Sequence, residues 1–145
     1  MLFELVAILC AGLFAGAAIY ITLVEHPARL ECGTELAATV FGPSYRRAAV
    51  MQASLAAAGL VAAGLAWATG RGVLVLTGGV LLGTVIPFTL VVILPTNKRL
   101  LDPRLARGSA EAAALLRRWG QLHAVRSIAG SLAFGVLLWN LTRAQ

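Results

Sequence analysis

Four long stretches without a charged residue constrain the fold of this chain more than any other feature. A helix rises about 1.5 Å per residue, so about 20 residues cross the roughly 30 Å hydrocarbon core of a bilayer. The stretches cover residues 5–24, 48–70, 72–97 and 127–142. The last reaches spanning length if its helix begins near residue 121. We therefore predict an all-α integral membrane four-helix bundle, a single domain over 1–145, with spans at about 5–24, 48–70, 72–97 and 121–142.

Composition agrees with this assignment. Hydrophobic residues make up 59% of the chain and charged residues 12%, about half the charged share of ordinary soluble domains. The net charge of +6 could suggest a nucleic-acid partner. The cations lie between the apolar stretches, however, and do not form a basic stripe with interleaved exposed aromatics, so we expect no nucleic-acid partner.

The connections between the stretches differ in length and charge. Only Gly70-Arg71-Gly72 separates the second stretch from the third, which predicts a tight hairpin between helices 2 and 3. The connections at about 25–47 and 98–126 share one side of a four-span protein. They hold ten of the cations: Arg29, Arg46, Arg47, Lys98, Arg99, Arg104, Arg107, Arg117, Arg118 and Arg126. The positive-inside rule places both connections in the cytoplasm and both termini outside.

The fourth helix is expected to begin in the cytoplasm. Ser109 can cap it, with Glu111 favourably placed in the first turn. The residues Trp119, His123, Arg126 and Gly130 follow i, i+4, i+7, i+11 spacing and form one stripe. An aromatic anchor, a hydrogen-bonded histidine and a snorkelling arginine would also explain this stripe.

Polar residues from other helix ends should meet this stripe. His26 and Arg29 follow the first span, Tyr45 and Gln52 share one face of the second, and Asn97 ends the third. Polar groups near a bilayer are costly unless they are paired. The topology brings these residues to one membrane face, whereas the opposite face offers little comparable. We expect a pocket there that is apolar inside and polar at its rim.

These residues also carry a resemblance to a known family. The segments concerned are Gly12–Arg29 with Glu25-His26-Pro27-Ala28-Arg29, Tyr45-Arg46-Arg47 with Gln52, Pro87-Phe88-Thr89, Pro95-Thr96-Asn97 and Trp119-x-x-x-His123-x-x-Arg126. Together they resemble the anthrone oxygenase-like family, a domain-of-unknown-function family of small four-span membrane proteins. Its members are mostly bacterial, which implies a bacterial inner-membrane location here.

The resemblance implies oxidation of a flat, hydrophobic anthrone- or quinone-like compound by a monooxygenase without a metal or flavin cofactor. In that hypothesis His123 removes a proton, Arg126 and Asn97 stabilise the enolate, and Trp119 stacks on the ring system. Further contacts with the hydrophobic small molecule are then expected from His26, Arg29, Tyr45 and Gln52.

Two other classes of function stay open. Glu25, His26 and His123 could hold a metal ion, or the two histidines a haem, although no ligand-spacing motif supports either. Alternatively, the protein is not an enzyme and binds a lipid, a quinone or a membrane partner. The small-residue pairs Gly12/Gly16 and Gly79/Gly83 suit close helix packing and would also suit a homo-oligomer.

Overall fold

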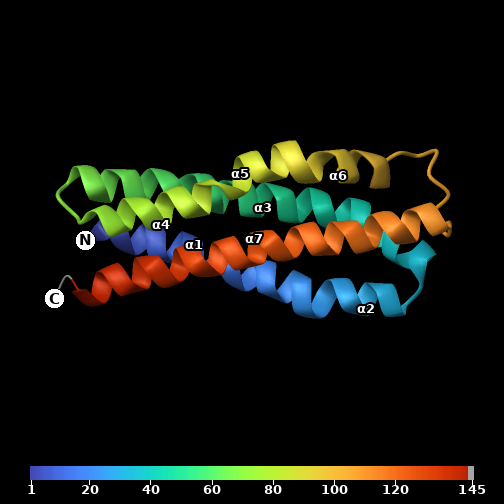
Figure 1. Cartoon of the computed structure of the whole chain (residues 1–145), viewed down its shortest axis with the longest axis horizontal. Helices are drawn as coiled ribbons and strands as arrows, with labels where there is room; N and C mark the ends of the chain where they lie inside the picture. The colour runs from blue at the N-terminus through green and yellow to red at the C-terminus, as the bar shows by residue number, and fades with distance from the viewer. Residues whose placement is uncertain (144–145) are drawn as a thin grey trace.

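The chain folds into four long helical rods that run side by side (Figure 1). The structure, a computed structural model, describes residues 1–143, and within them every regular element is helical. In chain order the rods are α1 (Leu2–Tyr20) with the π-helical turn η1 (Ile21–Glu25) and α2 (His26–Glu31); α3 (Thr34–Ala68); α4 (Val73–Gly83) with α5 (Val85–Phe88), the π-helical turn η2 (Thr89–Ile93) and α6 (Leu94–Leu100); and α7 (Ala110–Arg143). Over residues 1–143 all four rods are long and apolar enough to span a bilayer. The predicted membrane four-helix bundle is confirmed.

The rods form a ring in which α1 and α4 each pack against both α3 and α7. Thus α1 lies diagonally across from α4. The N-terminus, the end of α7 and the turn between α3 and α4 lie together at one end of the bundle, the hairpin end (Figure 1). The links from α2 to α3 and from α6 to α7 lie at the other end, the loop end.

The hairpin between α3 and α4 is as short as predicted. Gly70 has a φ of 91°, a left-handed conformation that costs glycine little. This conformation lets the Gly70 N–H donate to the Trp67 carbonyl and the Arg71 N–H to the Ala66 carbonyl. Backbone carbonyls at the end of α3 are therefore satisfied within the turn.

Helices extend farther at the loop end than the uncharged stretches do. Only Cys32 and Gly33 separate α2 from α3, so most of the connection expected at 25–47 is helical. The reason is burial: Ala37 and Phe41 on α3 pack into an apolar core with Leu116 of α7. This second core stabilises helix where hydropathy alone predicts a connection.

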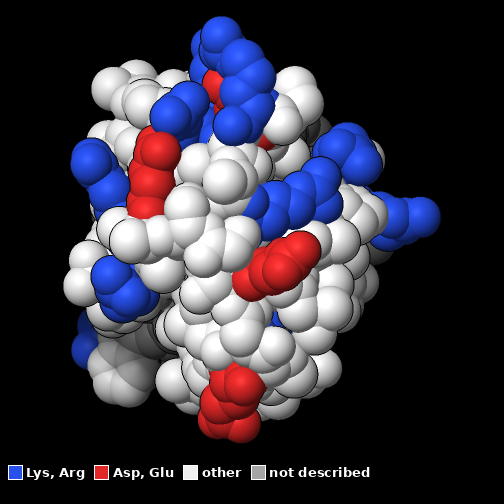
Figure 2. Space-filling view, turned by 90° about the vertical axis from the view of Figure 1, so that its right-hand side faces the viewer, with Lys and Arg blue, Asp and Glu red and all other residues white. Residues whose placement is uncertain are grey.

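The extension of α7 at this end was predicted and is confirmed. Ser109 Oγ accepts a hydrogen bond of 3.1 Å from the Ala112 N–H, so it caps the helix as expected. Figure 2 looks onto the loop end and shows Lys and Arg side chains gathered on it. In the loop before α7, hydrogen bonds from the side chain and backbone of Arg104 lower the pKa of Asp102 to about 2.

In one of the two predicted small-residue pairs, Gly79 and Gly83, both glycines lie in the contact between α4 and α3. A Cβ on Gly79 would lie 2.2 Å from Ala63 Cβ, and one on Gly83 would lie 2.9 Å from Leu60 Cδ2. These glycines therefore allow α4 to approach α3 closely. In the other pair, Gly16 meets nothing within 4 Å in the described part of the chain.

A polar cluster ties the hairpin end together. The Glu4 carboxylate is fully buried on α1. Asn140 Nδ2 donates to its Oε1 at 2.7 Å, and Arg71 Nε lies 3.2 Å from Oε2 as an ion pair. One side chain of α1 is thus linked to α7 and to the α3–α4 turn. We expected few polar side chains at this face compared with the loop end, and this cluster was not predicted.

Candidate functional site

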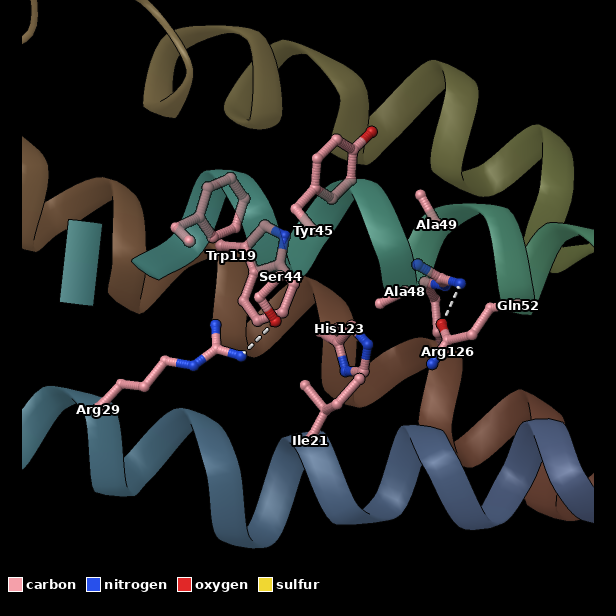
Figure 3. A pocket seen from close by; sticks show the side chains of 11 residues that line it. Ile21, Arg29, Ser44, Tyr45, Ala48, Ala49, Gln52, Trp119, His123 and Arg126 are labelled. Carbon is pink, nitrogen blue, oxygen red and sulfur yellow. Dashed lines mark hydrogen bonds between the residues drawn. The ribbon is translucent and has the colours of Figure 1, made fainter. Parts of the chain in front are cut away.

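The predicted stripe on α7 lies on one buried face, directed into the bundle toward the loop end. Trp119, His123 and Arg126 are each less than a tenth exposed, and Gly130 is buried on the same face. The stripe faces α3 and the η1 segment of the first rod (Figure 3). Helical spacing alone therefore placed these side chains correctly.

Aromatic rings stack along this stripe. The Trp119 ring centroid lies 4.8 Å from that of His123 and 5.1 Å from that of His26. Phe41 meets Trp119 edge-on at 5.3 Å. His26 can come this close because position 120 is glycine: a Cβ there would lie 2.6 Å from His26 Nε2. Trp119 therefore contacts both histidine rings.

A chain of hydrogen bonds fixes the His123 ring from the neighbouring first rod. Its Nδ1 lies 3.0 Å from Thr22 Oγ1, which lies 2.7 Å from Ser127 Oγ, which lies 3.0 Å from the Ala18 carbonyl. Ser127 Oγ also lies 3.3 Å from the His123 carbonyl. Carbonyl oxygens only accept, so the Ser127 hydrogen is used there or at Ala18, and the Thr22 hydrogen is used at Ser127. The hydrogen between Thr22 and His123 therefore comes from Nδ1. In the neutral ring this leaves Nε2 as the acceptor nitrogen.

The two π-helical turns sit beside this site, and each ends just before a proline. Pro27 follows η1 and Pro95 follows η2, each within the first two residues of the next helix. Proline has no N–H and its ring crowds the carbonyl four residues earlier, so regular α-helical bonding cannot continue through it. A π-helical turn accommodates the break, and such turns are frequent at functional sites.

Arg126 is a buried cation whose hydrogen-bond partner is neutral. Its Nη2 donates to Gln52 Oε1 at 2.6 Å, and its guanidinium lies 5.6 Å from the centre of the Phe14 ring. No carboxylate among residues 1–143 forms an ion pair with it. Arg126 Nε and Gln52 Nε2 also lack a hydrogen-bond partner there. An anion beside Arg126 would therefore supply interactions that the described chain does not.

Arg29 differs from Arg126 because its charge is neutralised. Its Nη2 pairs with the Glu25 carboxylate and donates to Ser44 Oγ at 2.7 Å (Figure 3). The Arg29–Ser44 bond joins α2 to α3 beside the smaller cavity, which both residues line. Arg29 thus holds two rods together at the loop end.

Two cavities adjoin the polar cluster. The smaller has a volume of about 20 Å³, enough for about one water molecule. The larger, of about 160 Å³, lies between α3 and the segment formed by α5 and η2. The residues that line both are Tyr45, Ala49, Gln52 and Arg126. The Arg126–Gln52 pair therefore lies at the boundary between the two cavities.

The structure brings most of the predicted site residues together. Those lining the smaller cavity are Arg29, Tyr45, Gln52, Trp119, His123 and Arg126. His26 joins them through its ring contact with Trp119. Asn97 is buried on α6 but lines neither cavity, and its side-chain amide has no hydrogen-bond partner among residues 1–143.

The residues suggested as metal ligands are not gathered into one cluster. Nowhere in residues 1–143 do three or more histidine, cysteine, aspartate or glutamate side chains come together as a metal site would require. Glu25 pairs with Arg29, His26 packs on Trp119, and the Nδ1 of His123 is engaged by Thr22. The set Glu25, His26 and His123 therefore has no common ligand position.

The chain matches the family model described as anthrone oxygenase over residues 38–136. It belongs to the anthrone oxygenase family. The part of this anthrone oxygenase family member that matches includes Gln52, His123 and Arg126, whereas Thr22 and His26 precede it. Comparison with curated proteins and with solved structures gave no significant match.

Three hydroxyls at the site of this anthrone oxygenase family member were not expected from its sequence. Thr22 and Ser127 hold His123, and Ser44 binds Arg29. A signal for Ser127 was available, since it follows His123 by four residues and shares its face. Thr22 and Ser44 depend on packing between rods and have no comparable signal.

Proposed function

We propose that this protein binds a flat, apolar, weakly acidic compound of the anthrone class and oxidises it with dioxygen. The observation that carries the proposal is Arg126, a residue 9% exposed within a membrane-spanning helix, whose guanidinium is bound to a neutral amide. Ionisable groups inside a bilayer are costly and commonly mark functional sites. The family assignment favours the same class of substrate.

Arg126 suits the charge that develops when such a compound loses a proton. An anthrone has a methylene carbon between two rings, and its anion places negative charge on the carbonyl oxygen. A preformed cation in a site of low polarity stabilises that oxyanion far more than water-exposed arginine would. Gln52 holds the guanidinium at the boundary between the cavities, so Arg126 is oriented before substrate binds.

His123 is the proposed base. Its Nδ1 hydrogen is committed to Thr22, which leaves Nε2 free to accept a proton. The hydrogen bonds through Thr22 and Ser127 fix the ring, and the Trp119 ring stacks on it. In this arrangement Trp119 positions His123, a revision of the stacking role expected for it from sequence.

The proposed reaction balances without another oxidant. His123 takes a proton from the methylene carbon, and the resulting anion transfers electrons to dioxygen, forming a carbon–oxygen bond. The peroxide takes that proton back from His123. Removal of the second methylene proton then breaks the oxygen–oxygen bond, forms the second carbonyl and releases water. One anthrone and one dioxygen give one anthraquinone and one water.

Oxygen uptake with anthrone, measured on protein in nanodiscs, tests this proposal. Replacing His123 by alanine should lower the rate about 10²–10⁴-fold, the usual contribution of a general base. The matched control is Ile128→Ala, which changes a lipid-exposed residue of the same helix and should leave the rate unchanged. Full activity in His123→Ala would refute the proposed mechanism. Anthrone binding without oxygen uptake in the wild type would instead favour a binding protein.

We also propose that the loop end faces the cytoplasm, as the positive-inside rule requires for the end that carries most of the cations. Cations gather there in Figure 2, and the hairpin end holds Arg71 and Arg143. The substrate site would then lie within the bundle toward the cytoplasmic side of the membrane.

A further inference from the structure

The larger cavity differs from the smaller in what surrounds it. Its α3 wall includes Ala49 and Ala53, and its opposite wall includes Ile86 and Leu90. Ala53 and Leu90 are also exposed on the outer surface of the bundle. In a membrane that surface meets lipid tails. The cavity therefore reaches from Arg126 to the hydrocarbon-facing side of the protein.

Tight packing between α3 and the third rod stops where this cavity begins. Along α4, Gly79 and Gly83 bring the backbones together. Beyond Thr84 the rod bends, and α5 and α6 no longer follow the line of α4 (Figure 1). Small side chains on α3 face this part of the rod, so neither helix fills the space between them.

The backbone of the rod is interrupted along the same stretch. A turn at Thr84 separates α4 from α5, Pro87 lies within α5, and η2 follows directly. The bonds from Thr84 N–H to the Val80 carbonyl and from Phe88 N–H to the Thr84 carbonyl are kept, whereas Pro87 and η2 remove regular α-helical hydrogen bonds. Thr89 Oγ1 satisfies one carbonyl by donating to Val85 O at 2.6 Å. Helix interruptions at membrane depth are tolerated where they line a cavity, which is the case here.

The two ends of the larger cavity differ in polarity. Tyr45, Gln52 and Arg126 form the inner end, whereas Ala53, Ile86 and Leu90 form the outer part. A flat apolar molecule with one oxygen suits this change from a polar inner end to an apolar outer part. Its rings contact the aliphatic side chains and its oxygen reaches Arg126. The smaller cavity, of about 20 Å³, cannot hold a ring system.

We propose that the substrate enters from the bilayer interior, between Ala49 and Ala53 on α3 and Ile86 and Leu90 on α5 and η2. The larger cavity, of about 160 Å³, then holds the part of its ring system nearest Arg126, and the rest lies in the opening. The proposal rests on the proposed function for the identity of the substrate. His123 lines the smaller cavity, so the methylene edge of the central ring has to point across the boundary between the cavities toward it. Ala53 determines which molecules enter, since any larger side chain at this position narrows the opening.

Replacing Ala53 by phenylalanine tests this route. Two readouts are needed in nanodiscs: oxygen uptake with anthrone, and quenching of tryptophan fluorescence by added anthraquinone, which reports binding without turnover. Ala53→Phe should weaken quenching at least tenfold and raise the KM for anthrone. The matched control Ala57→Phe changes an alanine one turn along α3 that is also lipid-exposed but lies outside this cavity, and it should behave as wild type.

The outcomes separate the two proposals. If Ala53→Phe and Ala57→Phe both bind and turn over as wild type does, the lateral route is wrong and the proposed oxidation stands. If Ala53→Phe alone loses binding while the wild type consumes no oxygen, the route stands and the oxidation is wrong. Should Ala53→Phe fail to fold, Leu90→Phe narrows the opening from the other wall at an exposed position without adding a tryptophan, and normal binding in that variant overturns the route.

Discussion

Arg126 donates to the side-chain oxygen of Gln52 at 2.6 Å, and this bond joins α7 to α3 in the interior of the bundle. It is the polar contact that separates the two cavities. A glutamine orients the arginine without neutralising it, so the positive charge remains available to an anion. A substitution at position 52 that neutralises Arg126 should therefore weaken binding and keep stability, whereas one that removes the acceptor should lower stability.

Replacing Gln52 by glutamate should weaken substrate binding while preserving the fold. The new carboxylate would pair with Arg126 and satisfy its charge, because the geometry for a charge-assisted hydrogen bond already exists. We expect the thermal midpoint in detergent to be retained and the KM for anthrone to rise at least tenfold. Gln52→Leu should instead lower stability by about 1–3 kcal/mol, since it leaves Arg126 without that acceptor. Unchanged KM in Gln52→Glu would contradict a role for the Arg126 charge in binding.

Thr22 should influence catalysis through His123. Thr22→Val keeps the shape of the side chain but removes the acceptor for Nδ1, so the ring loses the contact that fixes its tautomer. We expect kcat to fall about tenfold or more with KM little changed, since Thr22 lines neither cavity. Thr22→Ser restores the hydroxyl and should recover most of the rate. A valine variant as fast as wild type would show that Nδ1 needs no partner here.

The stripe on α7 could be predicted from sequence because helical spacing places every fourth or third residue on one face. The tight hairpin followed from the single charged residue between two apolar stretches. The extension of α3 toward Thr34 could not be predicted this way. It depends on apolar contacts of Phe41 with residues of α7 that are far away in the sequence.

The interior of the candidate site was only partly predictable for the same reason. Topology brings His26, Tyr45 and Trp119 to one level, but the side chains that complete the site are chosen by packing between rods. Asn97 was expected at that level and is buried on α6, yet it lines neither cavity. Hydropathy gives depth in the membrane and does not give the direction in which a side chain points.

Gly120 should be essential for the ring stack around Trp119. An alanine Cβ at this position would lie 2.6 Å from His26 Nε2, so the ring would have to move. We expect Gly120→Ala to destabilise the protein by about 1–3 kcal/mol, as overpacking usually does. Gly135→Ala on the same helix meets nothing within 4 Å in residues 1–143, and it should be neutral or stabilising by up to about 1 kcal/mol. Thermal unfolding of both variants in detergent measures the difference.

The orientation of the bundle can be read from Cys32, which is exposed in the link between α2 and α3 at the loop end. If this end faces the cytoplasm, a membrane-impermeant maleimide should label Cys32 in inverted vesicles and not in intact cells. Cys10 is buried in α1, and Cys32→Ser provides the control for labelling there. Labelling of Cys32 in intact cells would reverse the proposed orientation.

The polar cluster at the hairpin end should stabilise the bundle without affecting the site. Asn140→Leu removes the donor that binds Glu4 at 2.7 Å, which leaves a fully buried carboxylate oxygen without its hydrogen bond. Such a loss costs about 1–3 kcal/mol, and more for a charged group. We expect a lower thermal midpoint, with kcat and KM unchanged because Asn140 lines neither cavity of the site. Adding Glu4→Gln should restore part of the stability, since a neutral amide is cheaper to bury than a carboxylate. An additive loss in the double variant would mean that Asn140 and Glu4 contribute independently, contrary to the contact between them.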